Sequence, residues 1–367
     1  MFKNIAKIMA IFVLLVIILL FLFGYITKQD EEVEIIKKID LDFIGNDYLL
    51  ENISQIDEND YLLFVRQRAI DDNGEFAGSL TYNYIIYRYN LDTGLFSNNI
   101  KFRAGYEYNG INNRDNCFWI TLIDYENYEQ NNENTQIWKI DYNTMTVKNK
   151  FENIEPIYNL IIANVKDYIA YSKADGMYIA NNNFKEPKLI IHNLLNEEDT
   201  INLKRFMPVE FFQDKLVYMK LGYEWTEGIG VYDIINNEDY FFSQTDIQYL
   251  GYKNEYIYYT QQYVPESIYK ININTLKEEK IFDIPINQDY LDKTVYLLNE
   301  EKYILIVENK YINEDVEILF SLYDIKDVSL IAKYVLPKER YANIDNVFWG
   351  NNKIIFTKSY DMFEWRY

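Results

Sequence analysis

The residue types that carry most enzyme chemistry are scarce in this chain of 367 residues, which contains one cysteine, Cys117, and one histidine, His192. A serine nucleophile needs a base beside it, and zinc, copper and haem sites need several histidine or cysteine ligands. Cys117 begins the apolar run Cys-Phe-Trp-Ile-Thr-Leu, and His192 ends the run Leu-Ile-Ile-His. We therefore predict a buried structural thiol, a histidine at the end of a strand, and neither a metal site nor a cofactor.

Carboxylates are abundant instead. The chain has 57 Asp and Glu residues against 36 Lys and Arg residues, so its formal charge is −21. A field of this sign repels phosphate backbones, which argues against nucleic-acid partners. Carboxylate pairs can hydrolyse glycosides, but with so many carboxylates the sequence singles out no pair. A carbohydrate-active hydrolase or lyase therefore stays open as an alternative function.

Two acidic segments come closest to known binding motifs. Asp71–Glu75 lacks the spacing of a calcium loop, D-x-[DN]-x-[DN]-G, and Ser172–Gly176 lacks the spacing of the sialidase-type box S-x-D-x-G-x-T-W. We interpret both segments as turns. No phosphate loop of the form G-x-x-x-x-G-K-[ST] occurs.

The elements that must position these residues follow a short phrase that recurs six times. Its clearest copies are Tyr87–Gly94, Trp138–Thr144 and Tyr269–Thr275. Each copy is an alternating apolar stretch that runs into Asn or Asp and then a turn, because the side chains of Asn and Asp bond the backbone two residues further on. We call this Asn or Asp the pivot. The six pivots are Asn90, Asp141, Asn181, Asp233, Asn272 and Asp324.

The pivots recur with the period of a β-propeller blade. Neighbouring pivots are separated by 51, 40, 52, 39 and 52 residues, and a period of about 40–50 residues made of short strands is typical of propellers. A solenoid of helix pairs would instead show apolar residues at a spacing of about 3.6. The runs here alternate and are rich in Tyr, Ile, Val and Phe, which favours strands.

An apolar run near the N-terminus predicts the location of the protein. Ile8–Ile26 has 19 residues without a charge, and as a helix it would span about 28 Å of a hydrocarbon core roughly 30 Å thick. Lys3 and Lys7 precede the run and acidic residues follow it, so the N-terminus is expected in the cytoplasm and the rest outside. We expect an uncleaved signal anchor in the cell membrane. A cleaved signal peptide is the alternative, although no A-x-A-like site follows the run.

We predict a seven-bladed β-propeller behind this helix, with six or eight blades as alternatives. The expected organisation is a cytoplasmic segment 1–7, a transmembrane helix 8–26, a tether 27–32 and a propeller domain 33–367. The last segment supplies three strands and then the chain stops, whereas Val33–Leu41 forms a spare strand at the other end. Joining this strand to Phe363–Tyr367 would complete the seventh blade and remove the open edges of the ring.

In period and strand pattern, residues 33–367 resemble the extracytoplasmic bacterial β-propeller repeat domains, that is, TolB-like domains and related ones. The resemblance implies an all-β domain that serves as a binding or scaffold platform more often than as an enzyme. It carries over no functional residue, because no diagnostic family motif is present.

The two faces of such a ring should differ. Strand direction alternates within a blade, so the pivot turns should lie on one face, the pivot face, and the long connections on the other, the loop face. The predicted loop-face connections are Arg68–Tyr82, Asp124–Thr135, Gly222–Gly228, Gln261–Glu266 and Asn309–Asp315. Insertions confined to one face of a repeat fold often mark its binding surface.

We predict that the loop face binds a protein or a cell-envelope polymer without catalysis. The candidate binding residues are aromatic residues of the long connections: Tyr125, Tyr128, Tyr223, Trp225, Tyr263 and Tyr311. A Trp in a polar loop must either pack down or meet a partner. A purely structural role within a membrane complex, through the apolar helix, is a further alternative.

Overall fold

The structure is a computed structural model that describes residues 36–45, 47–67, 82–123, 135–152, 157–164, 166–173, 175–192, 205–222, 226–243, 246–261, 265–290, 292–298, 302–340, 342–350 and 353–367. The predicted transmembrane segment Ile8–Ile26, its tether, Val33 and the segment Asp71–Glu75 lie outside the described residues. Within the described ranges, no helix has the length and apolar character needed to cross a membrane.

Apart from one short 3-10 helix, η1 (Asp42–Ile44), the regular elements of the described residues are all strands. The strands group into seven four-stranded antiparallel units. The first unit contains β2 (Tyr48–Gln55), β3 (Asp60–Gln67), β4 (Tyr82–Asn90) and the start of β5 (Leu95–Asn112), and the second contains the rest of β5, β6 (Cys117–Ile123), β7 (Thr135–Asp141) and β8 (Thr146–Phe151). The third to fifth units contain, in turn, β9 (Tyr158–Ile162), β10 (Tyr168–Lys173), β11 (Gly176–Asn181) and β12 (Lys188–His192); β13 (Arg205–Phe212), β14 (Lys215–Leu221), β15 (Thr226–Asp233) and β16 (Glu238–Ser243); and β17 (Ile247–Lys253), β18 (Tyr256–Gln261), β19 (Ser267–Asn272) and β20 (Glu278–Asp283). The sixth unit contains β21 (Asp292–Leu298), β22 (Tyr303–Ile312), β23 (Asp315–Asp324) and β24 (Ser329–Val335), with β25 (Glu339–Arg340) on β23, and the seventh contains β26 (Ile344–Gly350), β27 (Lys353–Lys358), β28 (Asp361–Arg366) and β1 (Ile36–Lys38).

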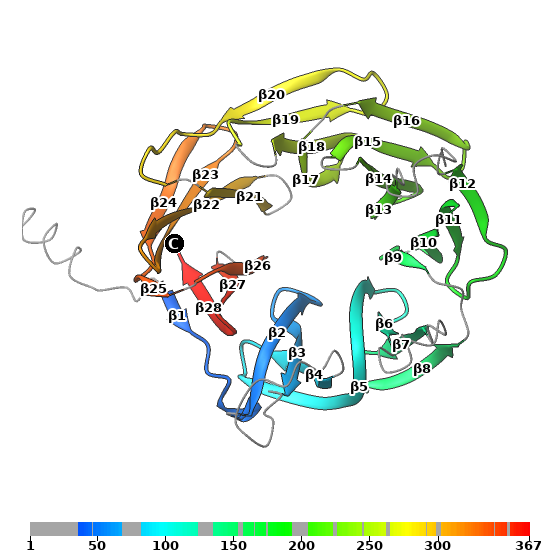
Figure 1. Cartoon of the computed structure of the whole chain (residues 1–367), viewed down its shortest axis with the longest axis horizontal. Coiled ribbons are helices and arrows are strands. Elements are labelled where there is room, and N and C mark those ends of the chain that lie inside the picture. The colour runs from blue at the N-terminus through cyan, green and yellow to red at the C-terminus, as the bar shows by residue number, and fades with distance from the viewer. Residues whose placement is uncertain are drawn as a thin grey trace, which may run out of the picture.

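Figure 1 shows the units arranged around a ring, with the first strand of each unit towards the centre and the fourth at the rim. The all-β prediction is confirmed. The fourth strand of the first unit is part of an 18-residue strand, β5. Its first half pairs with β4 as far as Ala104, and its second half pairs with β6 from Gly105 onward. No loop separates the first two units, because one strand serves both.

The ring is closed by its two ends, as predicted. The N-terminal strand β1 pairs antiparallel with β28, with Ile36 opposite Trp365, and completes the seventh unit. The described strand is shorter than the predicted Val33–Leu41. It covers Ile36–Lys38, and the chain then turns through η1 towards the first unit. Ile39 still donates its backbone N–H to the Met362 carbonyl at 2.8 Å.

The units pack against each other through the apolar side chains of their alternating strands. Trp119 and Trp365 are the largest side chains that are completely buried. Within the second unit the ring of Trp119 stacks on Phe151 at 5.6 Å, and Trp119 also packs in one cluster with Leu160 and Ile169 of the third unit. The ring of Trp365 in the seventh unit lies 5.5 Å from that of Phe320 in the sixth. Each buried aromatic side chain removes about 150–250 Å² from water, so these contacts contribute much of the core.

The single cysteine and the single histidine both lie in the strand framework of the ring. Cys117 is a free and fully buried cysteine whose thiol donates to the carbonyl of Asp115 at 3.2 Å. Burial raises the pKa of this thiol, which disfavours the reactive thiolate. His192 is the last residue of β12 and is exposed. Both predictions are confirmed, and Ser172–Gly176 is the predicted hairpin between β10 and β11.

The six pivots all end the third strand of their unit and organise the turn to the fourth strand. Each pivot side chain accepts a backbone N–H two or three residues further on, at 2.8–3.1 Å. The N–H of the following residue donates to a carbonyl of the hairpin that joins the first two strands, at 2.7–3.1 Å. The recurring phrase therefore ties the pivot turn to the hairpin between the first two strands of the same unit by hydrogen bonds, and we call such turns clamped.

Replacing a buried pivot is expected to destabilise the ring. Asp233 accepts from Ile235 N at 3.1 Å and from Asn236 N at 2.9 Å, and it pairs with Lys215 at 2.8 Å. Asp233→Ala should lower the free energy of unfolding by about 1.5–3 kcal/mol, because hydrogen bonds to a charged group are lost and Lys215 is left unpaired. Urea titration measures the change. Asp327→Ala, an exposed change in the pivot turn of the sixth unit, should stay within about 0.5 kcal/mol, and equal effects would contradict the pivot role.

Candidate functional site

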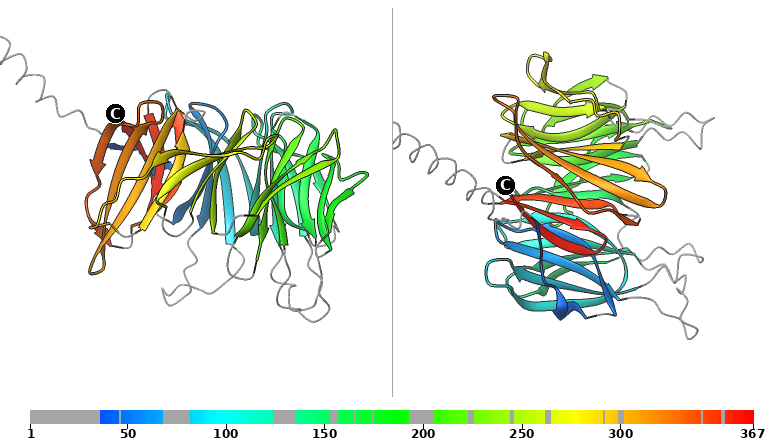
Figure 2. Two further views of the ribbon diagram at one scale, coloured as in Figure 1. Left: turned by 90° about the horizontal axis from the view of Figure 1, so that it is seen from above. Right: turned by 90° about the vertical axis from the view of Figure 1, so that its left-hand side faces the viewer.

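The two faces of the ring carry connections of different length. Because strand direction alternates, the pivot turns and the hairpins between first and second strands lie on the pivot face. The length of these connections ranges from two residues (213–214) to six residues (182–187). On the loop face, 14 residues separate Gln67 from Tyr82 and 12 separate His192 from Arg205. Figure 2 shows the ring edge-on, with the C-terminus on the pivot face. The longest connections therefore lie on the loop face as predicted, but three loop-face connections have only two residues: 174–175, 313–314 and 359–360.

Five of the six predicted aromatic binding residues lie in segments that the structure does not describe. Tyr125, Tyr128, Tyr223, Trp225 and Tyr263 lie outside the described residues, so their grouping stays a prediction. The exception is Tyr311, which is 53% exposed and donates its hydroxyl to Asp292 Oδ2 at 2.6 Å. This hydrogen bond raises the pKa of Tyr311.

The setting of Tyr311 differs from the prediction of a loop over Asn309–Asp315. Strands β22 and β23 continue as a ladder to the pair Ile312–Asp315, and a two-residue turn joins them, with Asn313 at φ +60°. Asn favours this left-handed conformation, so a tight hairpin replaces the loop. The side chain of Tyr311 is therefore held on a paired strand and next to Asp292.

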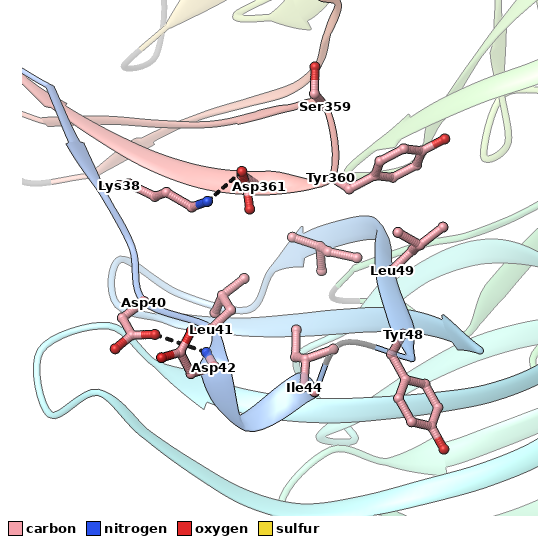
Figure 3. A pocket seen from close by; sticks show the side chains of 12 residues that line it. Lys38, Asp40, Leu41, Asp42, Ile44, Tyr48, Leu49, Ser359, Tyr360 and Asp361 are labelled. Atoms are coloured by element: carbon pink, nitrogen blue, oxygen red, sulfur yellow. Dashed lines mark hydrogen bonds and ion pairs between the residues drawn. The ribbon is translucent and has the colours of Figure 1, made fainter. Parts of the chain in front are cut away.

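A hollow on the loop face lies where the ring closes. It has a volume of about 860 Å³ and is lined by residues of both chain ends: Lys38, Asp40, Leu41, Asp42, Ile44, Gly45, Tyr48, Leu49, Leu50, Ser359, Tyr360 and Asp361. It forms because β1 has only three residues and the chain then crosses from the seventh unit to the first. Figure 3 shows Lys38 reaching Asp361, and the Lys38 Nζ–Asp361 Oδ2 distance is 2.6 Å.

The hollow has polar walls that suit binding. Asp40, Asp42 and Asp361 supply carboxylates, and Lys38 is already paired with Asp361. Asp40 Oδ1 also accepts the backbone N–H of Asp42 at 2.9 Å. Within the described part of the chain, no group of three His, Cys, Asp or Glu residues has the arrangement of a metal site. The hollow can accept hydrogen-bond donors and cationic groups.

Sequence reasoning missed this hollow for a simple reason. Lys38 and Asp361 are 323 positions apart, and no local pattern marks either residue. The only signal that could have found the hollow was the predicted closure of the ring, which brings the first and last strands together.

Of the carboxyl groups on the described inner strands of the ring, four have a raised pKa. These are Glu51 on β2, Glu107 on β5, Glu210 on β13 and Asp345 on β26. Burial raises the pKa of each. The hydroxyl of Tyr249 donates to Glu210 Oε2 at 2.5 Å. None of these four shifts is caused by a second carboxylate.

Among the described arginines that pair with carboxylates, Arg66 and Arg114 lie in different units. Arg66 Nε lies 3.5 Å from Glu51 Oε1, and its guanidinium lies 4.4 Å from the ring centre of Tyr82. Arg114 pairs with Asp167 at 3.0 Å on the pivot face. These arginines hold neighbouring strands and units together rather than a common ligand.

Comparison with known proteins shows the class of fold. No family model and no curated protein matches the sequence. The β-propeller domain of the Trilobed protease from Pyrococcus furiosus, described as having an open velcro topology, is 12% identical, with a TM-score of 0.52 over 87% of this chain and 95% of that chain. A chain of a Mitotic Checkpoint Complex is 9% identical, with a TM-score of 0.50 over 90% of both chains. The WD40 domain of SCAP from fission yeast is 11% identical, with a TM-score of 0.48 over 90% of this chain and 98% of that chain.

The chain is thus an all-β protein with the fold of a β-propeller. Identities of this size show the fold alone. The expected likeness to TolB-like domains stays a prediction. In this chain the ring is closed by the pairing of β1 with β28.

Proposed function

We propose that the protein is a membrane-anchored, seven-bladed β-propeller that binds a protein or a cell-envelope polymer with its loop face, outside the cell and without catalysis. The observation that carries this proposal is the asymmetry of the two faces. Six clamped, short turns make the pivot face uniform. The loop face has the longest connections and the hollow at the ring closure.

The anchor supports an orientation for the ring. Ile36 lies opposite Trp365 in the strand ladder. The next residue, Arg366, lies opposite Lys353, which begins β27 at the pivot face. The chain therefore enters the ring from the pivot face. Between Ile26 and Ile36 there are nine residues, which span at most about 30 Å when extended. The pivot face is therefore held near the bilayer, and the loop face points away from it.

The chemistry of the loop face supports a polar partner. The hollow offers carboxylates and the hydroxyls of Tyr48 and Tyr360. The predicted aromatic residues, such as Tyr223 and Trp225, would add apolar contact area. Aromatic side chains beside polar groups are common in binding surfaces for proteins and sugars.

A cross-linking experiment on intact cells tests both the location and the binding face. In a Cys117→Ser background, Trp225→Cys, in a predicted loop-face connection, and Thr144→Cys on the pivot face each carry a membrane-impermeant maleimide photo-cross-linker. Trp225→Cys should react readily and capture its partner, whereas Thr144→Cys, exposed in a pivot turn near the membrane, should react slowly and capture little.

Each failure has a separate meaning. Reaction at both positions only after the membrane is breached would contradict the outside location. Equal capture from both positions would contradict the assignment of binding to the loop face. Turnover of an added polysaccharide by the full chain would favour the alternative, a carbohydrate-active hydrolase or lyase.

A further inference from the structure

Large apolar side chains stand exposed at the tips of the pivot turns. Of the five most exposed large hydrophobic residues in the described chain, four are in or directly after a pivot turn: Ile235 (70%), Leu95 (68%), Val328 (55%) and Leu276 (54%). The fifth, Ile286 (84%), lies on the loop face between β20 and β21. The short, clamped face of the ring therefore presents apolar tips to its surroundings.

The turn itself does not require apolar residues at these positions. The fourth residue after the pivot has a left-handed backbone in five of the six turns, and Gly94 (φ +66°) and Asn237 (φ +59°) satisfy this without strain. Leu276 (φ +57°) and Val328 (φ +52°) occupy the same position. A left-handed conformation costs an ordinary side chain roughly 1–2 kcal/mol, and a β-branched residue such as valine is a marked outlier there.

The second unit shows what an apolar residue at this position can gain. Met145 also has a left-handed backbone, at φ +53°, but it is only 3% exposed and packs in the core with Ile140 and Tyr142. Burial of its side chain offsets the backbone strain. Leu276 and Val328 bear the same strain without burial, so folding of the isolated chain does not account for them.

The place of these two tips suggests what covers them. They belong to the fifth and sixth units, and the sixth is next to the seventh unit, where the chain enters from the pivot face. The nine residues before Ile36 reach at most about 30 Å. Residues 272–279 carry Lys277 with Glu278 and Glu279, and residues 324–329 carry Lys326 with Asp324 and Asp327, so each tip has a formal charge of −1.

We propose that the pivot turns of the fifth and sixth units rest on the surface of a phospholipid bilayer, with Leu276 and Val328 at the boundary between headgroups and acyl chains. This inference rests on the membrane anchor of the proposed function. Apolar side chains near Lys residues are suited to that boundary. Because each turn carries a formal charge of −1, anionic lipids do not attract it, and the contact is apolar.

The experiment uses the full chain in phosphatidylcholine proteoliposomes. In a Cys117→Ser background, Asn274→Cys, exposed in the fifth pivot turn, carries an environment-sensitive fluorophore, and Ile286→Cys carries the same fluorophore on the loop face. Headgroup spin-labelled lipid should quench the fluorophore at position 274 severalfold more than that at 286. Added salt should not reduce the difference.

A double variant separates contact from folding. Leu276→Asn with Val328→Gly places at both positions the residue types that the sister turns carry at Asn237 and Gly94. It should lower the quenching at 274 to the level at 286, while its melting temperature stays equal to that of the parent or rises, because strain is relieved. A variant with unchanged quenching would overturn the proposed contact.

The remaining outcomes are also decisive. Equal quenching at 274 and 286, in a chain that resists alkaline extraction from the membrane, would overturn the contact and leave the anchor in place. A chain that alkaline treatment extracts would contradict the anchor and the contact together. Quenching that disappears when the protein is diluted in lipid would assign the tips to a second copy of the chain and overturn the bilayer contact.

Discussion

Deletion of residues 33–41 is expected to abolish the cooperative unfolding of the ring. The segment contains β1, which covers the edge of β28. It also contains Ile39, which is 6% exposed and packs with Ile355 and Met362. Losing a buried isoleucine costs about 2–5 kcal/mol, and each lost backbone hydrogen bond about 1 kcal/mol. Against a typical stability of about 5–15 kcal/mol this is a large loss, and the freed edge of β28 invites aggregation.

Scanning calorimetry and light scattering measure this effect. Ile39→Ala in the full chain should reproduce the burial part, about 2–5 kcal/mol. Lys37→Ala, an exposed change on the same strand, should stay within about 0.5 kcal/mol. A deletion variant with an unchanged melting transition would show that β1 does not hold the ring closed.

Stability is also expected to be highest at mildly acidic pH. Burial raises the pKa of six carboxyl groups: Glu51, Glu107, Glu210, Asp239, Glu308 and Asp345. A raised pKa means that protonation favours the folded state. The stability these groups contribute is complete below their ordinary pKa of about 4 and is lost as pH rises through the folded-state pKa. Protonation also reduces the net charge of −21, which lowers the repulsion within the folded chain and acts in the same direction.

Two pivots set the lower limit. Burial acts to raise the pKa of Asp141 and of Asp233, but hydrogen bonds from backbone N–H groups and from Lys148 and Lys215 hold both below the ordinary value. Their contribution is present above the ordinary pKa of about 3.9 and is lost as pH falls through the folded-state pKa. The melting temperature should therefore rise from pH 7 to about 5 and fall below about 4.

Thermal melts across this range test the profile. Glu210→Gln keeps an acceptor for the Tyr249 hydroxyl but removes a half-buried charge, so it should raise the melting temperature at pH 7 and reduce the gain on acidification. Glu152→Gln, an exposed change, should alter neither. A maximum at neutral pH would show that burial of these carboxyl groups does not govern the pH dependence.

Local patterns in the sequence determined most of the fold. Alternating apolar residues predict strands, and Asn or Asp followed by a turn predicts how each third strand ends, because both effects act within a few residues. All six pivots were found this way, and their side chains make the expected bonds. The closure by an N-terminal strand followed from the missing fourth strand at the C-terminus.

Only the tertiary structure decided the features that depend on neighbours distant in sequence. The continuity of β5, the hairpin at Tyr311 and the hollow between Lys38 and Asp361 arise from how strands meet across units. The contrast between Met145 and Leu276 is of the same kind. Both are apolar residues at one position of the repeat, and the packing of each unit alone determines that the first is buried and the second is exposed.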